Sequence, residues 1–325
     1  MSESLPTFQN VPPNKTELPP AQKRIGEKAI EFGLFCCAAM SIVVTLAIAA
    51  VVLYGAFQFF ALDNGEALSA GEVSRRVWNF FTGTEWAAAF VDAEYGIWPL
   101  LLGTLTVAGL AALIALPIGL STAIYLSEYA QPGVRKVAKP ILELLAGIPT
   151  VVYGFLAISA LTPLLSYLVP GLQGFNQLAG GIVVGVMIIP MVASLSEDAL
   201  RAVPRSLRDG AIALGANKAE TSIKVVVPAA LSGITASFIL AISRAIGETM
   251  AVSLACGEQV RFTLDPRVGA QTMTSFIVHM AKGDVQHGST RFNSLFAVAA
   301  LLFFITLAMN ILAQRFLGRY RQVYQ

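Results

Sequence analysis

Two residues of opposite charge lie four positions apart in an otherwise uncharged run of the chain. Arg244 and Glu248 belong to the segment S-R-A-I-G-E-T-M-A. Residues four apart share one face of a continuous helix, so the sequence predicts that these side chains pair. An Arg at the middle of a membrane helix costs roughly 2.5–3.5 kcal/mol even on a lenient insertion scale, so it usually faces a bundle interior or an aqueous path.

The chemistry that this pair could support is the passage of an anion. A guanidinium group presents a fixed fork of N–H donors that matches a tetrahedral oxyanion. Glu248 would prevent Arg244 from holding the anion too tightly, and Thr249 follows directly. We therefore predict a substrate pathway that contains Arg244, Glu248 and Thr249. The alternative is a purely structural salt bridge that neutralises itself and holds helices together.

The composition indicates that a membrane surrounds these residues. Hydrophobic residues make up 55% of the 325 positions and charged residues only 13%, about half the charged fraction of a soluble domain. The fold class predicted is therefore an all-α polytopic membrane protein. The three cysteines, Cys36, Cys37 and Cys256, have no metal or disulfide spacing, and we expect them to face lipid or the core.

Six transmembrane helices are predicted from long uncharged runs, because about 20 apolar residues cross a bilayer. The run from Leu144 to Ser196 is about twice that length and is divided by Pro170, Gly171 and Gly174. The predicted spans lie near 32–62, within 95–127, and near 141–168, 178–196, 229–256 and 292–314. The organisation that follows is a flexible N-terminal tail (1–31), a first helix (32–62), an extracytoplasmic loop (63–94), a core permease domain (95–316) with a polar loop (204–228), and a C-terminal tail (317–325).

Two outer segments contain shorter elements. The aromatic residues of 63–94 are suited to a short interfacial helix. The apolar stretch 272–281 is too short to cross, so it is expected to be re-entrant or to lie on the surface. His279 and His287 lie near Asp284, but no third ligand has a suitable spacing, so no metal site is predicted.

The polar loop 204–228 reads as two short helices. Pro204 can start the first, Gly215 can end it in a left-handed conformation, and Asn217 with Glu220 forms a capping pair for the second. A compact, basic helix-turn-helix between two spans indicates a docking surface. The alternative is a solvated connector.

The same loop carries a family resemblance. The pattern Asp209-Gly210-Ala211, three residues, Gly215, nine residues, Val225-x-Val227-Pro228 resembles the EAA loop of ABC-importer membrane subunits. Asp replaces the usual Glu, Gly the first Ala, and Val both Ile and Leu. The resemblance implies the type I importer permease fold and a cytoplasmic loop that couples to a separate ATPase. The implied coupling residues are Asp209, Gly210, Ala211, Gly215 and Pro228.

Further motifs narrow the resemblance. I-Y-L-S-E-Y-A (124–130), E-L-L-A-G-I-P-T-V-V-Y-G-F (143–155), S-L-S-E-D-A-L (194–200) and R-A-I-G-E-T-M-A (244–251) are similar to the PstC-type permease of the bacterial high-affinity phosphate importer. This implies import of inorganic phosphate at the expense of ATP across the bacterial inner membrane. The implied partners are a PstA-type permease, two PstB-type ATPases, a PstS-type extracytoplasmic phosphate-binding protein and membrane lipids, with no nucleic acid.

No catalytic machinery is predicted. The chain has no Gly-Lys dipeptide and hence no Walker A loop, and it lacks G-x-S-x-G and H-E-x-x-H. We therefore expect a transporter subunit that is not itself an enzyme and has no catalytic residue, cofactor or metal. The alternatives are a permease for another oxyanion such as sulfate or molybdate, a stand-alone secondary transporter or channel, and a membrane sensor.

The distribution of basic residues predicts the orientation. Fifteen Lys and Arg residues lie on the side that holds both termini and the polar loop, against six on the other side (Arg75, Arg76, Arg261, Arg267, Lys282 and Arg291). Under the positive-inside rule the termini and the loop are cytoplasmic.

Topology reporters test this orientation. Reporters fused after Gln325 and near Gly210 should read cytoplasmic, and a reporter near Gly83 should read extracytoplasmic. An extracytoplasmic signal at Gln325 would require an odd number of crossings and would contradict the six-span assignment.

Overall fold

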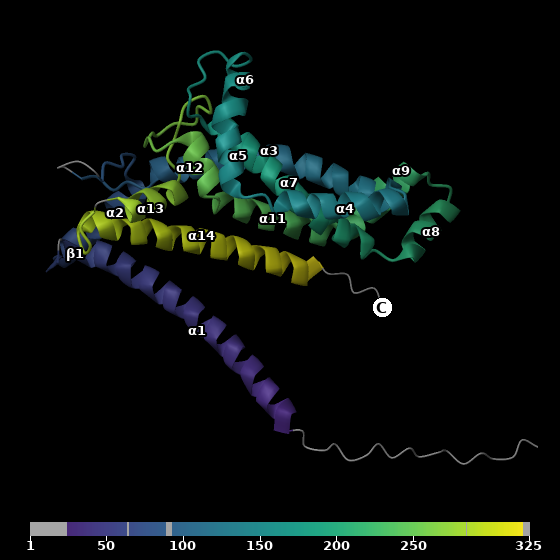
Figure 1. Ribbon diagram of the computed structural model, residues 1–325, viewed down its shortest axis with the longest axis horizontal. Coiled ribbons are helices and arrows are strands. Elements are labelled where there is room, and N and C mark those ends of the chain that lie inside the picture. Colours follow the sequence, from purple (N-terminus) through teal and green to yellow (C-terminus); the bar gives the residue numbers. More distant parts are fainter. Residues whose placement is uncertain (1–24, 64, 89–92, 284, 321–325) are drawn as a thin grey trace, which may run out of the picture. The chain divides into compact units, whose positions relative to one another are not determined.

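A computed structural model describes residues 25–63, 65–88, 93–283 and 285–320 (Figure 1). The chain forms two compact units, Met1–Val51 and Val52–Gln325. The first contains most of α1 (Ile25–Ala61), whose side chains there are almost all exposed. Of the predicted tail 1–31, residues 1–24 lie outside the described residues and 25–31 belong to α1. Similarly, 317–320 belong to α14 (Thr290–Tyr320), and 321–325 lie outside the described residues.

The second unit is built around α3 (Trp98–Ile124) and α7 (Gln177–Arg201), with α11 (Leu231–Ile246) and α14 beside them (Figure 1). Helices in membranes approach closely where small residues meet. A Cβ at Gly181 would lie 2.5 Å from Leu110 Cβ, and one at Gly119 would lie 2.6 Å from Val192 Cβ. The core between these helices includes Ala111, Ala115, Val184, Ile188 and Val192, all 0% exposed.

The predicted span 141–168 is wrong as a single helix. The chain forms α4 (Pro132–Ala146) and then α5 (Thr150–Leu156), a π-helical turn η2 (Ala157–Leu161) and α6 (Thr162–Ser166), with a bend of 83° between α4 and the helices after it. Ile148 precedes Pro149, and a residue before proline is disfavoured in the α-helical region. The bend therefore falls at 147–149, inside a run that hydropathy alone reads as continuous.

The predicted span 229–256 is also divided. A 70° bend precedes α11, and the elements before this bend are α9 (Lys218–Thr221), the π-helical turn η3 (Ser222–Val226) and α10 (Val227–Ala229). A second break, at 247–249, separates α11 from α12 (Met250–Cys256). Four helices of the described part are long and apolar enough to cross a membrane, and the number reaches the predicted six if each bent pair is one span.

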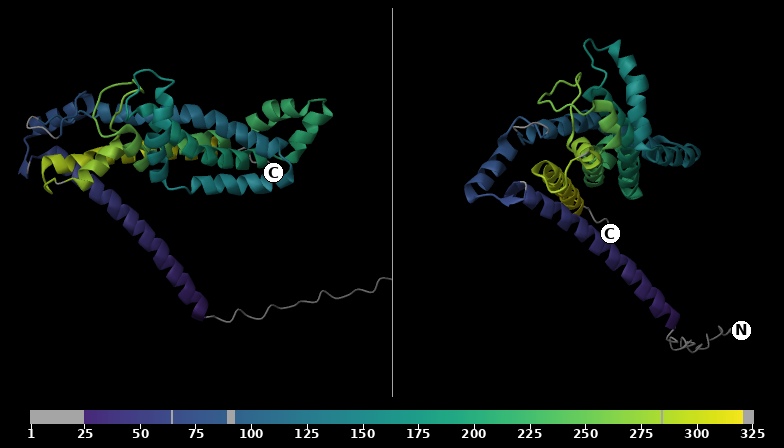
Figure 2. Two further views of the ribbon diagram at one scale, coloured as in Figure 1. Left: turned by 45° about the horizontal axis from the view of Figure 1, so that its top comes forward. Right: turned by 60° about the vertical axis from the view of Figure 1, so that its left-hand side comes forward.

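One end of this unit carries the outer elements. They are a two-stranded hairpin of β1 (Leu62–Asp63) and β2 (Glu66–Ala67), α2 (Ala70–Thr82) and α13 (Met273–Lys282). The prediction of a short helix within 63–94 is confirmed by α2, and the stretch 272–281, predicted to be re-entrant or on the surface, forms α13. Phe80 of α2 makes an edge-to-face contact with Phe59 near the end of α1, and Trp86, which follows α2, makes one with Phe276 of α13. The same buried cluster includes Leu295 and Val298 of α14. The helical pair α8 (Arg205–Ala213) and α9 lies at the opposite end of the unit (Figure 2).

Two glycines of α3 test the close helix packing. Gly119→Ala should lower the free energy of unfolding by about 1–3 kcal/mol, because the new methyl overpacks against Val192. Gly109→Ala is the matched control, since a Cβ there meets nothing within 4 Å. Thermal unfolding of the purified chain in detergent measures both, and equal stability of the two variants would contradict this packing.

Candidate functional site

The loop 204–228 folds as the predicted pair of capped helices. α8 begins after Pro204, and Gly215 adopts a φ of +89° just beyond its end. Asn217 Oδ1 accepts from the Glu220 N–H at 2.9 Å, and Glu220 Oε2 accepts from the Asn217 N–H at 3.2 Å. This reciprocal capping box starts α9. The local prediction is confirmed. We call residues 204–228 the hairpin.

Arg208 connects the hairpin to the core. Its Nη2 lies 2.9 Å from Glu128 Oε1 and its Nε 3.3 Å from Glu128 Oε2. Its guanidinium also donates to the carbonyls of Leu200 and Val203 at the end of α7. The two side chains are only 18% and 9% exposed. Glu128 belongs to η1 (Tyr125–Tyr129), which continues α3. One side chain therefore joins the hairpin to both central helices.

A second buried carboxylate holds α4 against α7. Glu197 is 1% exposed and forms ion pairs with Arg135, with Lys139 at 3.1 Å and with Arg201 at 3.9 Å. Lys139 also contacts Asp198 at 2.7 Å. Sequence reasoning used these cations only to predict orientation and missed both ion-pair centres. An acidic residue at the end of an apolar run, as in Y-L-S-E-Y and S-L-S-E-D, was the available signal.

The outer surface of the hairpin is partly apolar. Leu214 is 92% exposed, Ile223 64% and Ile212 56%. Of the five predicted coupling residues, Ala211 is half-buried, and the exposed ones are Asp209, Gly210, Gly215 and Pro228. Exposed apolar side chains grouped on a surface held rigidly from behind are typical of a protein-docking site.

The predicted pairing of Arg244 with Glu248 is wrong. α11 ends at Ile246, so the two residues do not share a helix face. Glu248 is buried at 9% exposure, and its Oε1 accepts from the Ala251 N–H at 3.2 Å at the start of α12. Its carbonyl accepts from Thr274 Oγ1 at 2.7 Å. Half-buried Thr249 donates through its hydroxyl to the Gly247 carbonyl at 3.3 Å.

These contacts show that Glu248 and Arg244 have different roles. Glu248 stabilises the broken backbone, because its carboxylate satisfies an otherwise unpaired N–H at a helix start. Arg244 lies exposed in the last turn of α11 and, within the described part of the chain, has no hydrogen-bond or ion-pair partner. Its guanidinium is available to a ligand anion.

The fold of this chain is found in the membrane subunits of known transporters. Two solved structures share the fold. One is a chain of the MetNI methionine ABC transporter in an inward-facing conformation, with a TM-score of 0.52 and 18% identity over 70% of this chain and 95% of that one. The other belongs to a bacterial alginate ABC transporter in complex with an alginate pentasaccharide-bound periplasmic protein, with a TM-score of 0.60 and 15% identity over 91% and 96%.

Sequence relatives identify the family. Residues 115–322 match the family described as binding-protein-dependent transport system inner membrane component. A probable ABC transporter permease protein, YqgH of Bacillus subtilis, is 37% identical over 75% of this chain and 78% of the relative. The probable phosphate transport system permease protein PstC of Methanocaldococcus jannaschii is 31% identical over 92% and 97%. PstC of Haemophilus influenzae is 31% identical over 75% and 82%. The chain therefore belongs to the family of membrane permease components of binding-protein-dependent ABC transporters.

The connection through Arg208 can be tested by hydrogen exchange. In Glu128→Gln, amides of 205–228 should exchange about tenfold faster, a local loss of about 1.4 kcal/mol. Arg208 keeps its two carbonyl acceptors, so we expect local loosening and not unfolding. Asp209→Asn, an exposed change in the same helix, is the control. Equal protection in Glu128→Gln and the parent would contradict the role of the pair.

Proposed function

We propose that this chain is the PstC-type permease subunit of an ATP-driven importer of inorganic phosphate and forms half of its translocation pathway. The observation that carries the proposal is the exposed guanidinium of Arg244, which has no partner among the described residues and lies beside the break at 247–249. A guanidinium fork suits a tetrahedral oxyanion. Relatives named as phosphate permeases support phosphate as that oxyanion.

Thr249 and Glu248 complete the proposed pathway. Broken helices at membrane depth are tolerated where the backbone is buried in protein or lines a cavity. Glu248 and Thr274 hold this break in one conformation. The anion would then meet Arg244 at a fixed position, while Glu248 lowers the local positive potential so that the anion can leave.

The hairpin is the proposed contact with a separate ATPase. Asp209, Gly210, Ala211, Gly215 and Pro228 would form that contact, together with the exposed apolar side chains beside them. Because Arg208 joins the hairpin to α7 and to η1, a displacement of the hairpin would move both central helices. The complete importer would contain a PstA-type permease, two PstB-type ATPases and a PstS-type phosphate-binding protein.

The proposed location is the inner membrane, with both termini and the hairpin in the cytoplasm. The basic residues predicted to be cytoplasmic support this orientation in three dimensions. Arg135, Lys139 and Arg201 gather around Glu197, and Arg208 of α8 donates to the Leu200 carbonyl at the end of the same helix. The positive-inside rule places such a basic end in the cytoplasm.

Coupling is tested at Gly215. Gly215→Val places a β-branched residue at a φ of +89°, which costs roughly 1–2 kcal/mol or more for a residue with a side chain. We expect normal membrane insertion but loss of ATPase co-purification or of phosphate-stimulated ATP hydrolysis. Gly210→Ala supplies the residue usual in the family, at an open helical position, and should retain both. If Gly215→Val retains both activities, the hairpin is only a connector.

Substrate contact is tested at Arg244. Since Glu248 has its own partners, Arg244→Gln should assemble normally yet lower phosphate uptake at least about tenfold, equal to about 1.4 kcal/mol. Arg244→Lys, which keeps the charge but loses the fork, should be intermediate. Arg75→Gln, an exposed change in α2, is the control. Uptake is normalised to assembled complex and competed with sulfate and molybdate. Near-normal uptake by Arg244→Gln, or equal competition by all three anions, would contradict the proposal.

A further inference from the structure

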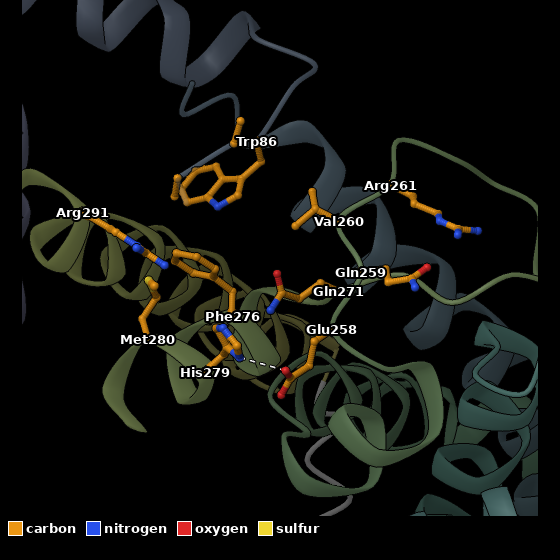
Figure 3. Close-up of a pocket in the computed structure, with 12 residues that line it drawn as sticks. Trp86, Glu258, Gln259, Val260, Arg261, Gln271, Phe276, His279, Met280 and Arg291 are labelled. Atoms are coloured by element: carbon orange, nitrogen blue, oxygen red, sulfur yellow. Dashed lines mark ion pairs between the residues drawn. The ribbon is translucent and has the colours of Figure 1, made fainter. Parts of the chain in front are cut away.

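We propose that the outer end of the permease contains a second oxyanion site, in a cavity remote from the hairpin. The cavity of about 470 Å³ lies between the loop that follows α2, the segment 258–261, α13 and the first turn of α14 (Figure 3). This volume accommodates a tetrahedral oxyanion with water molecules. The inference rests on the proposed function, which supplies both the outward orientation and phosphate as the ligand.

Two buried N–H donors line this cavity without a partner. Trp86 is 7% exposed, and its Nε1 has no hydrogen bond among the described residues. The Nε of Arg291, at the start of α14, is buried and also unpaired in that part of the chain. Figure 3 shows the Trp86 ring nitrogen and the Arg291 guanidinium on the side of the cavity closed by Phe276. Buried donors are nearly always satisfied, so two in one cavity indicate a missing acceptor.

A negatively charged acceptor suits these two donors best. Arg is protonated at every physiological pH, and both Arg and Trp side chains donate but cannot accept. No carboxylate of the described residues pairs with Arg291. An oxyanion offers acceptor oxygens to both donors and also compensates the charge of Arg291, which a neutral acceptor leaves uncompensated. The buried Gln271 amide faces the same space and can donate as well (Figure 3).

The opposite wall predicts which oxyanion is preferred. Glu258 Oε2 lies 2.8 Å from His279 Nδ1, and the remaining lone pairs of this carboxylate are acceptors in the cavity lining. A carboxylate repels an anion that has no proton but accepts a hydrogen bond from one that does. Phosphate carries at least one proton near neutral pH, whereas sulfate carries none. The cavity should therefore favour phosphate over sulfate.

Arg261 provides a matched control within the same lining. Its Nη1 donates to Gln173 Oε1 at 3.2 Å, and Figure 3 shows its guanidinium turned away from the other lining side chains. Arg261→Gln thus removes the same charge as Arg291→Gln from the lining of the same cavity, but not a donor aimed into the cavity.

The test follows Trp86 directly. The full chain, in lipid nanodiscs, is labelled with 5-fluorotryptophan at its three Trp positions, and Trp86→Phe identifies the Trp86 fluorine signal. Titration with inorganic phosphate should shift this signal saturably, and sulfate should require at least tenfold more. Arg291→Gln should abolish the shift, Arg261→Gln should preserve it, and Glu258→Gln should reduce the phosphate preference.

The outcomes separate this inference from the proposed function. No saturable shift, or the same shift in Arg291→Gln, overturns the outer site even if the assembled complex still imports phosphate. A shift that phosphate and sulfate produce equally overturns the role of Glu258. A specific shift in a chain whose complex imports no phosphate retains the site and overturns the transport proposal.

Discussion

The crossing of α3 and α7 is the contact on which the rest of the second unit depends. A Cβ at Gly119 or Gly181 would lie within 2.6 Å of a side chain of the facing helix, and one at Gly185 would lie 3.1 Å from the Ala111 carbonyl oxygen, so the glycines let the two helices approach closely. In a membrane, where lipid competes for apolar surface, such close packing supplies much of the association energy. The ends of these helices then carry the charged groups, Glu128 and Glu197, that position the hairpin and α4.

A break in a membrane helix needs other groups to satisfy the backbone that it frees, because the membrane core offers no water for this purpose. The break at 247–249 persists because Glu248 and Thr274 satisfy the groups that it frees. It also releases Arg244 from the carboxylate that a continuous helix would have placed beside it. As a result, Glu248 stabilises the turn at the break, and the Arg244 side chain has no partner among the described residues.

Charge is arranged differently at the two ends of the second unit. At the hairpin end, buried carboxylates are surrounded by Arg and Lys, which fixes rigid connections. At the outer end, Arg291 and Trp86 line a cavity without an acceptor among the described residues. Ion pairs that are already formed hold elements together, whereas N–H donors without a hydrogen-bond partner are available for binding. This difference underlies our proposals of a mechanical role for one end and a ligand-binding role for the other.

The sequence by itself determined the features that depend on local chemistry. Uncharged runs identified a polytopic helical membrane protein, and Pro204, Gly215 and the Asn217–Glu220 box correctly described the hairpin. The motif at 209–228 indicated the family, which the match over 115–322 confirmed.

Only the tertiary structure decided which charges meet. Glu128 and Arg208 are 80 positions apart and Lys139 and Glu197 are 58 apart, so no local periodicity links them. The helix between Arg244 and Glu248 looked continuous because spacing does not report a break that is stabilised by Thr274 on another segment. Hydropathy and capping act within a few residues, whereas ion pairs and cavities depend on how distant helices pack.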